Sequence, residues 1–169
     1  SKASTGNLAV NPERCELGVL LTQTAGEYEE KLKKAGLELI IDKPDDPVVI
    51  MADRQHLWRI FDNLMNNICK YSMPGTRVYL TLKRGAAIDG DSVRARALVT
   101  FRNISKTRLN VSEEELMERF VRGDSSRNTE GSGLGLSIAS SLTKLQKGTM
   151  DLVVDGDLFK VSLCFDAVD

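Results

Sequence analysis

Apolar side chains recur at helical spacing in three separate stretches of the chain. In residues 16–34 they follow a three- and four-residue repeat that ends in lysines before Gly36. Residues 53–71 and 134–145 show the same repeat, and Asp53 is a favourable N-cap for the second stretch. We therefore predict three main helices, of which the second ends before Pro74 and Gly75.

Shorter stretches are continuously apolar or alternate between apolar and polar residues, as β-strands do. They cover residues 37–41, 48–51, 77–83, 93–103, 150–154 and 158–165. Turns are expected at 44–47, where two prolines remove ladder donors, at 85–91, and around Gly156. The pattern predicts an α+β fold in which about three helices cover one face of a mixed or antiparallel sheet.

Length and composition narrow the range of functions. The chain has 169 residues and a formal net charge of −1, which suits a single domain, 1–169, and argues against broad electrostatic binding of nucleic acid. Three cysteines without a C-x-x-C pair suit reduced thiols in a cytoplasmic setting. The chain has no initiator Met and no signal segment, so we expect a fragment of a longer protein.

A narrow polar stripe runs along the predicted helix 53–71. At about 100° per residue, Asn63, Asn67 and Lys70 fall within roughly 60° of one another. A separate sector of roughly 140° contains the apolar residues of the helix: Leu57, Ile60, Phe61, Leu64, Met65 and Ile68. The simplest interpretation is a solvated polar edge. Because asparagine is a poor helix former, its repetition favours a second interpretation, in which amide oxygens hold Mg²⁺ and the lysine neutralises phosphate.

A glycine-rich run, GSGLGL at residues 131–136, opens the third predicted helix. Glycines let the backbone approach a ligand closely, and a helix N-terminus offers unpaired N–H groups to an anion. The run has neither the preceding strand of a dinucleotide-binding fingerprint nor the Gly-Lys-Ser/Thr of a P-loop. Its combination with a separate Asn/Lys helix is more specific for a phosphate ligand than either feature alone.

Three sequence boxes together resemble the catalytic and ATP-binding domain of two-component sensor histidine kinases. Residues 63–72 (NLMNNICKYS) are similar to the N box, 120–123 (FVRG) to the F box, and 131–139 (GSGLGLSIA) to the second glycine box. The resemblance covers about residues 10–165. It implies the Bergerat fold of gyrase-type and Hsp90-type ATPases, a two-layer α/β sandwich whose mixed sheet is backed by about three helices. It also implies a mobile ATP lid, here 104–132, and identifies 1–9 as the remnant of a linker from the dimerisation helices.

The resemblance assigns a role to each matching position. It implies that Asn67 is the Mg²⁺ ligand, that Asn63 lines the same site, and that Lys70 contacts the phosphates of ATP. Tyr71 would lie towards the ribose, and Arg122 would approach the γ-phosphate, which makes Asn63, Lys70 and Arg122 the implied catalytic residues. Phe120 would face the phosphoacceptor domain. The resemblance also implies that ATP is bound by the loop at Ser132, Gly133, Leu134 and Gly135.

One box departs from the family pattern. Where these kinases have Asp-x-Gly-x-Gly, residues 103–107 have the sequence NISKT. Asn103 still offers an amide oxygen to the adenine amino group, without the negative charge of Asp. Ser105 and Thr107 cannot replace glycine in an unusual backbone conformation without strain.

Two functions therefore stay open. One is a kinase domain that transfers the γ-phosphoryl of Mg·ATP to a histidine on an adjoining dimerisation domain; the other is a nucleotide-binding regulatory module of the same fold that has lost phosphotransfer. A hydrolase or serine kinase of this fold is disfavoured by the FVRG motif and the Lys70-Tyr71 pair.

For the whole protein, the resemblance implies a homodimer anchored in the cell membrane, with this domain in the cytoplasm and a response regulator downstream. No nucleic acid partner is expected. The only histidine, His56, lies at the start of the N-box helix and not on a dimerisation helix. We therefore expect a structural or surface role for it.

Overall fold

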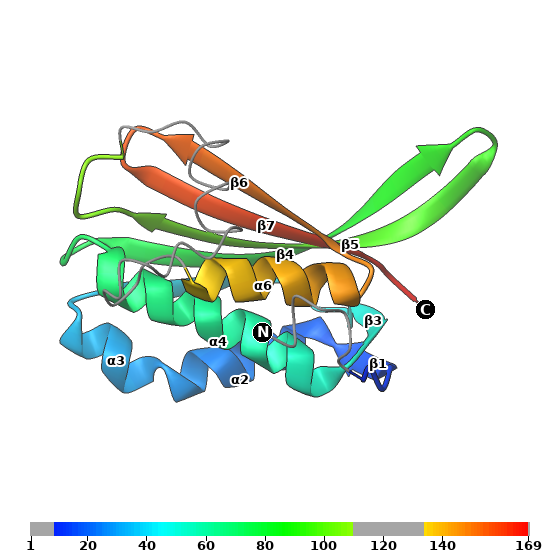
Figure 1. Ribbon diagram of the computed structural model, residues 1–169, viewed down its shortest axis with the longest axis horizontal. Helices are drawn as coiled ribbons and strands as arrows, with labels where there is room; N and C mark the ends of the chain where they lie inside the picture. Colours follow the sequence, from blue (N-terminus) through cyan, green and yellow to red (C-terminus); the bar gives the residue numbers. More distant parts are fainter. Residues whose placement is uncertain (1–8, 110–133, 169) are drawn as a thin grey trace.

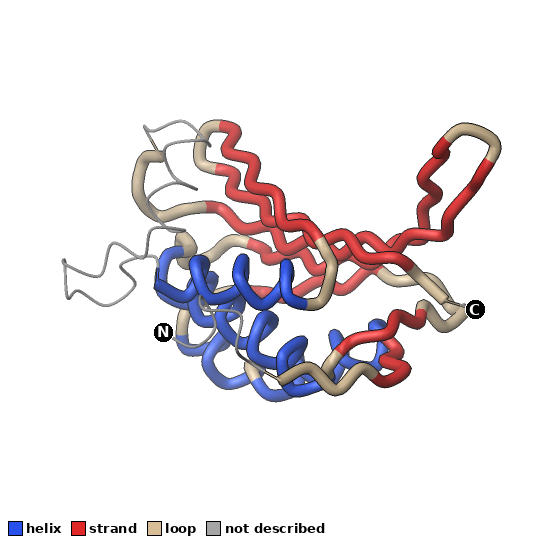
Figure 2. The backbone as a smooth tube through the Cα atoms, turned by 45° about the vertical axis from the view of Figure 1, so that its right-hand side comes forward, coloured by secondary structure: helices blue, strands red, loops and turns tan. Residues whose placement is uncertain are grey.

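The computed structural model describes residues 9–109 and 134–168 of the chain. These residues form four helices and seven strands, arranged as a layer of helices against one face of a sheet (Figures 1 and 2). The helices are α2 (Leu17–Glu27), α3 (Glu29–Lys34), α4 (Arg54–Tyr71) and α6 (Leu134–Leu145). The predicted α+β class with helices on one sheet face is confirmed.

The prediction of one continuous helix over 16–34 is wrong, because the chain leaves helical geometry at Tyr28. Its φ and ψ are −101° and 5°, and its side chain is buried. The phenol reaches α4, where its hydroxyl donates to the Asp62 carboxylate and lies 3.1 Å from the Asp62 carbonyl oxygen. Burying this ring and its hydroxyl bond outweighs the continuation of the helix, which Gly26 already weakens.

The main sheet has five strands in the order β2-β4-β5-β7-β6. Only β2 and β4 pair in parallel, so the sheet is mixed, as predicted. The strands are β2 (Glu38–Asp42), β4 (Arg77–Asp89), β5 (Ser92–Ile104), β6 (Thr149–Asp155) and β7 (Leu158–Asp166). The predicted turn around Gly156 joins β6 to β7, with Gly156 at a φ of +62°.

The predicted hairpin loop at 85–91 is wrong. Pairing between β4 and β5 continues to Asp89 and Ser92, and only Gly90 and Asp91 form the turn, with Gly90 at a φ of +63°. The end of this hairpin projects from the sheet as a two-stranded arm (Figure 1). Gly85 does not interrupt the strand, because an added Cβ there would meet nothing within 4 Å and its backbone is ordinary.

The sequence pattern did not predict the second sheet, which has two strands. Strand β1 (Glu13–Glu16) pairs antiparallel with β3 (Val49–Ala52). Only β3 was predicted as a strand, because β1 is four residues long and its residues were assigned partly to the first helix. A β-bridge from Val49 to Val168 ties this small sheet to the end of the chain.

The core lies between the helices and the inner face of the main sheet. All six residues of the predicted apolar sector of α4 are buried, and Phe61 packs against Phe101 of β5 with ring centroids 5.6 Å apart. On β5, Ala97, Val99 and Phe101 are buried as predicted, whereas Ala95 is exposed because it lies on the arm. The core therefore fixes α4 so that its polar stripe lies away from the sheet.

Candidate functional site

The polar stripe of α4 contains two side-chain amides whose nitrogen atoms have no hydrogen-bond partner among the described residues. Asn63 and Asn67 lie one helical turn apart and are both half-buried. Their Nδ2 atoms are buried, and no described residue hydrogen-bonds to either one. An unsatisfied buried donor costs about 1–3 kcal/mol. Two such groups at adjacent turns indicate a site for a polar ligand, because packing alone gives no reason to keep them.

The chemistry of these side chains fits a hard cation. An amide presents an oxygen as well as a nitrogen, and amide oxygens are suitable ligands for Mg²⁺. The described residues contain no group of three or more His, Cys, Asp or Glu side chains that would hold a metal by themselves. A magnesium ion here would therefore depend on amide oxygens together with phosphate oxygens and water, which is how Mg²⁺ is usually held beside a nucleotide.

The C-terminal end of α4 brings further predicted residues to the same place. Lys70 is exposed in the last turn of the helix, where an ammonium group also complements the helix dipole. Tyr71 is half-buried, and its carbonyl oxygen accepts a hydrogen bond from the Lys106 amide at 2.8 Å. The Met73 amide donates to the Ile104 carbonyl at 2.8 Å. The chain after β5 is therefore fastened to the end of the N-box helix.

Asn103, near the end of β5, joins this arrangement through its side chain. Its Nδ2 donates to Ser72 Oγ at 2.8 Å, and both residues are buried, with exposures of 4% and 3%. No described residue donates to Asn103 Oδ1. The amide oxygen predicted to meet an adenine amino group is thus not used by another described residue.

The altered box 103–107 follows an ordinary backbone path. Among the described residues, Lys147 alone has a positive φ outside glycine, so the strain expected at Ser105 and Thr107 is absent. Ser105 forms a β-bridge with Ser72, and its Oγ accepts from the Thr107 amide at 3.2 Å. The hydroxyl group replaces glycine flexibility with a local turn that side chains stabilise.

Helix α6 lies beside α4 and runs in the opposite direction (Figure 1). At one end of the pair, the Asp53 amide before α4 donates to Gln146 Oε1 after α6, at 2.8 Å. Since the helices are antiparallel, the beginning of α6, with Leu134 and Gly135, lies towards the C-terminal end of α4. The fold thus brings the start of the glycine helix towards the end of the N-box helix.

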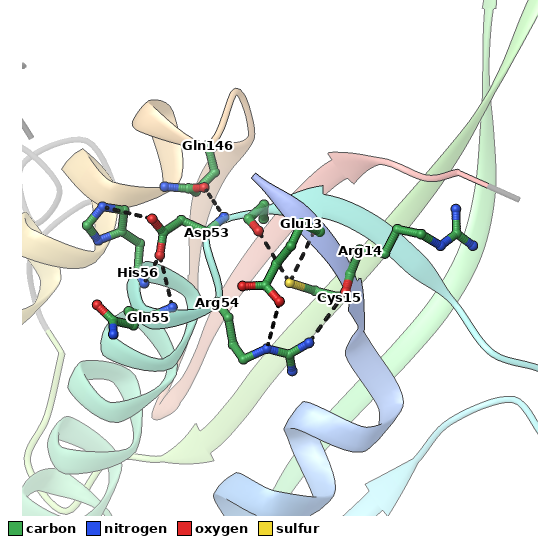
Figure 3. Close-up of polar contacts among 9 residues, drawn as sticks. Glu13, Arg14, Cys15, Asp53, Arg54, Gln55, His56 and Gln146 are labelled. Carbon is green, nitrogen blue, oxygen red and sulfur yellow. Dashed lines mark hydrogen bonds and ion pairs between the residues drawn. The ribbon is translucent and has the colours of Figure 1, made fainter. Parts of the chain in front are cut away.

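The opposite end of α4 is a polar junction centred on Asp53 (Figure 3). The Asp53 carboxylate accepts hydrogen bonds from the amides of Asn11, Gln55 and His56, at 3.0, 3.0 and 3.2 Å. His56 Nε2 lies 3.0 Å from the Ala9 carbonyl oxygen and 3.7 Å from Asp53 Oδ2. Here the only histidine holds the incoming chain against α4, which is the structural role expected for it.

Asp53 and Tyr28, two ionisable groups that contact α4 or cap it, have shifted pKa values. Burial acts to raise the pKa of Asp53, but the three amide donors and the nearby His56 outweigh it and hold that pKa below its usual range. Burial, together with the hydrogen bond to Asp62 and the charge of its carboxylate, raises the pKa of Tyr28 far above its usual range. Both groups stabilise the position of α4 and lie outside the amide site.

Several predicted site residues are not described by the structure. Arg122, Phe120, Ser132 and Gly133 lie outside the described residues, as does 110–132 of the predicted lid. Leu134 and Gly135 are in α6, but their side chains are not described. Conversely, the sequence pattern did not predict Ser72 as a partner of Asn103; the only signal was a hydroxyl residue directly after the N box.

A groove of about 680 Å³ lies between the end of α3 and the start of β4, and Ile104, the first residue of the predicted lid, also lines it. Its lining includes Lys33, Gly36, Arg77 and Tyr79, and none of the predicted site residues. Across the described residues, no helix has both the length and the apolar character needed to cross a membrane.

A family model and curated relatives identify the same class of protein. The model of a family described as histidine kinase-, DNA gyrase B-, and HSP90-like ATPase matches residues 52–166. The probable sensor protein PcoS of Escherichia coli is 31% identical over 170 residues, which cover 98% of this chain and 34% of that protein. The signal transduction histidine-protein kinase BaeS of Escherichia coli K12 is 30% identical over 150 residues, covering 88% of this chain and 30% of that protein.

Among solved structures, the catalytic domain of histidine kinase ThkA superposes with a TM-score of 0.75 at 18% identity. The match covers 92% of this chain and 95% of that one, and at this identity it shows the fold. The chain spans about a third of the length of the curated relatives PcoS and BaeS. The predicted similarity to a histidine-kinase catalytic domain is confirmed.

Proposed function

Because the chain belongs to the histidine kinase-, DNA gyrase B-, and HSP90-like ATPase family, we propose that it binds Mg·ATP as the catalytic domain of a sensor histidine kinase. The observation that carries this proposal is the pair of side-chain amides on α4, Asn63 and Asn67, whose buried Nδ2 atoms have no described partner. They lie on the helix whose end also contains Lys70 and contacts Asn103 through Ser72.

Each predicted residue has a proposed part in binding. The Asn67 amide oxygen is a Mg²⁺ ligand, Asn63 lines the same site, and Lys70 neutralises phosphate oxygens. Asn103 meets the base, and Tyr71 lies towards the ribose. When bound, Mg²⁺ would neutralise charge on the phosphate oxygens. The remaining proposed contacts come from Arg122, Ser132, Gly133, Leu134 and Gly135. These residues lie outside the described part of the chain or have side chains that are not described.

The proposed reaction transfers the γ-phosphoryl group to a histidine of an adjoining dimerisation domain. The imidazole nitrogen forms a bond to the γ-phosphorus while the bond to the β-γ bridging oxygen breaks, and ADP leaves. His56 is unsuited to be the acceptor, because it lies 14 residues from Lys70 along α4, roughly 20 Å at 1.5 Å per residue. Such transfer depends on positioning and charge neutralisation, which suits a site without a nucleophile of its own.

For the whole protein, we propose a membrane-anchored homodimer with this domain in the cytoplasm and a response regulator as the next phosphoryl acceptor. These proposals are supported by the names of the relatives, one a probable sensor protein and the other a signal transduction histidine-protein kinase.

Substituting Asn67→Ala tests the metal site, with Asn66→Ala as the matched control. Asn66 is also half-buried on α4, but in helical projection it lies about 100° away from Asn67. Calorimetry should measure binding of a non-hydrolysable ATP analogue with and without Mg²⁺. We expect Asn67→Ala to lower the Mg²⁺-dependent affinity for the analogue at least tenfold. Its free energy of unfolding should stay within about 0.5 kcal/mol of that of the parent. The Asn66→Ala control should bind like the parent.

Equal binding by Asn67→Ala and the parent in saturating Mg²⁺ would remove Asn67 from the site. Transfer of labelled phosphoryl to a supplied dimerisation domain then separates the kinase from the alternative regulatory module. The alternative predicts measurable ATP binding with no transfer.

A further inference from the structure

The contact between Asn103 and Ser72 pairs two groups whose hydrogen-bonding roles are interchangeable. A serine hydroxyl both donates and accepts, and an asparagine amide has a donor end and an acceptor end of nearly the same shape. In the structure Nδ2 donates to Ser72 Oγ, at 2.8 Å, which leaves Oδ1 facing away from Ser72. If the amide turns by 180°, the hydroxyl donates to Oδ1 and Nδ2 faces away. Both arrangements keep the same number of hydrogen bonds.

Nothing else among the described residues selects one of these arrangements. The Asn103 side chain makes its only described hydrogen bond with Ser72, and the Ser72 hydroxyl has no second described partner. The backbone around the pair is fixed, since the Ser72 amide donates to Ile68 and β5 pairs with β7 through Asn103 and Phe159. The positions of both residues are therefore set, while no contact among the described residues fixes the orientation of the amide.

This freedom matters for a purine base. At the same ring position, adenine carries an amino group, which donates, and guanine carries a carbonyl oxygen, which accepts. A carboxylate at position 103 would only accept, so it would pair with adenine and repel guanine. The Asn103 amide can accept from adenine through Oδ1 or donate to guanine through Nδ2, with Ser72 completing the bond in either case.

We propose that the Asn103–Ser72 pair allows this site to bind both adenine and guanine nucleoside triphosphates. The proposal rests on the proposed function, because it requires Asn103 to face the base of a bound nucleotide. It extends that function to base specificity and gives Ser72 the role of a positioning residue, whose hydroxyl adapts to the orientation of the amide.

The test compares two non-hydrolysable nucleotides, Mg·AMP-PNP and Mg·GMP-PNP, by calorimetry on the chain. For the parent we expect dissociation constants within about tenfold of each other. Asn103→Asp should retain the adenine nucleotide and weaken the guanine nucleotide by about 10- to 100-fold, the range for facing a buried acceptor with another acceptor. Asn66→Ala, on α4 and outside the pair, should leave the ratio of the two dissociation constants unchanged.

The possible results separate the two proposals. If the parent binds AMP-PNP but binds GMP-PNP more than 100-fold more weakly, the inference on base specificity is wrong and the proposed function stands. If the parent binds neither nucleotide, the proposed function itself fails. If Asn103→Asp folds and leaves the ratio unchanged, the pair does not read the base. The ratio of the two dissociation constants measured for the parent decides the inference on base specificity even if Asn103→Asp does not fold.

Discussion

The Asp53 carboxylate makes a prediction whose size can be worked from its contacts. It is 7% exposed and accepts three backbone amides from two parts of the chain, Asn11 before β1 and the first turn of α4. Substitution Asp53→Asn keeps the Oδ1 acceptor that caps α4, because asparagine caps helices as well as aspartate does. It replaces Oδ2 by an NH₂ group, which faces the Asn11 amide donor to donor.

The expected loss is about 2 kcal/mol at pH 7, since one hydrogen bond to a charged group contributes about 1.5–3 kcal/mol. Asp53→Ala should lose about a further 1 kcal/mol, the usual contribution of the N-cap. Urea unfolding followed by circular dichroism measures both values. Asp46→Asn, an exposed carboxylate in the turn between β2 and β3, is the matched control and should change stability by less than about 0.5 kcal/mol.

The pH dependence gives the sharper result. The folded-state pKa of Asp53 is lowered, so its contribution is fully present above the unfolded value of about 3.9 and is lost as pH falls through the folded pKa. Below the folded-state pKa, Asp53 of the parent is a protonated carboxyl, which has one donor group and one acceptor group, as asparagine has. The stability difference between parent and Asp53→Asn should therefore not fall between pH 7 and about pH 4, and it should shrink as pH drops below that range. A difference that does not change over the whole range would refute the charge-based explanation.

Two other substitutions test the packing that positions α4 and the sheet. Tyr28→Phe removes the hydroxyl bond to Asp62 and should destabilise the fold by about 1–3 kcal/mol in urea unfolding. Because the Tyr28 pKa is raised, the contribution of this hydroxyl to stability should be fully present below about pH 10 and decline as pH rises above it. Gly148→Ala would place a Cβ 2.5 Å from the Phe165 ring, so we expect a loss of about 1–3 kcal/mol, against no steric penalty at Gly85→Ala, where a Cβ meets nothing within 4 Å. Equal melting temperatures for the two glycine variants would contradict this account.

Local patterns predicted the elements whose structure depends on nearby residues. The apolar sector of α4 and its Asp53 cap follow from helical spacing and capping chemistry alone, and both are found in the structure. Strand β1 and the break at Tyr28 depend on partners far along the chain, in β3 and at Asp62. No periodicity in residues 13–34 contains that information, because a four-residue strand is defined by its pairing.

The same distinction applies to the candidate site. Asn63 and Asn67 were placed together correctly because their spacing of four residues is a property of one helix. The departure at residue 103 was also visible, and its chemistry was anticipated as an amide oxygen without charge. What could not be read was the partner: Ser72 and Asn103 are 31 residues apart and meet only because β5 ends beside the C-terminus of α4. That partner is the basis for the proposal that the contact between residue 103 and the base is adaptable.

The two ends of α4 differ in how their polar groups are satisfied, and this separates stability from binding. At the N-terminal end, the Asp53 carboxylate and backbone amide both have partners in the chain, apart from the buried Gln146 Nε2 beside them. Along the C-terminal half, Asn63 and Asn67 keep buried donors without described partners, at a cost that the core face of the same helix offsets. A helix can retain such groups only where its remaining contacts exceed that cost. The buried apolar face of α4 is therefore a physical condition for leaving amides available to a ligand along the same helix.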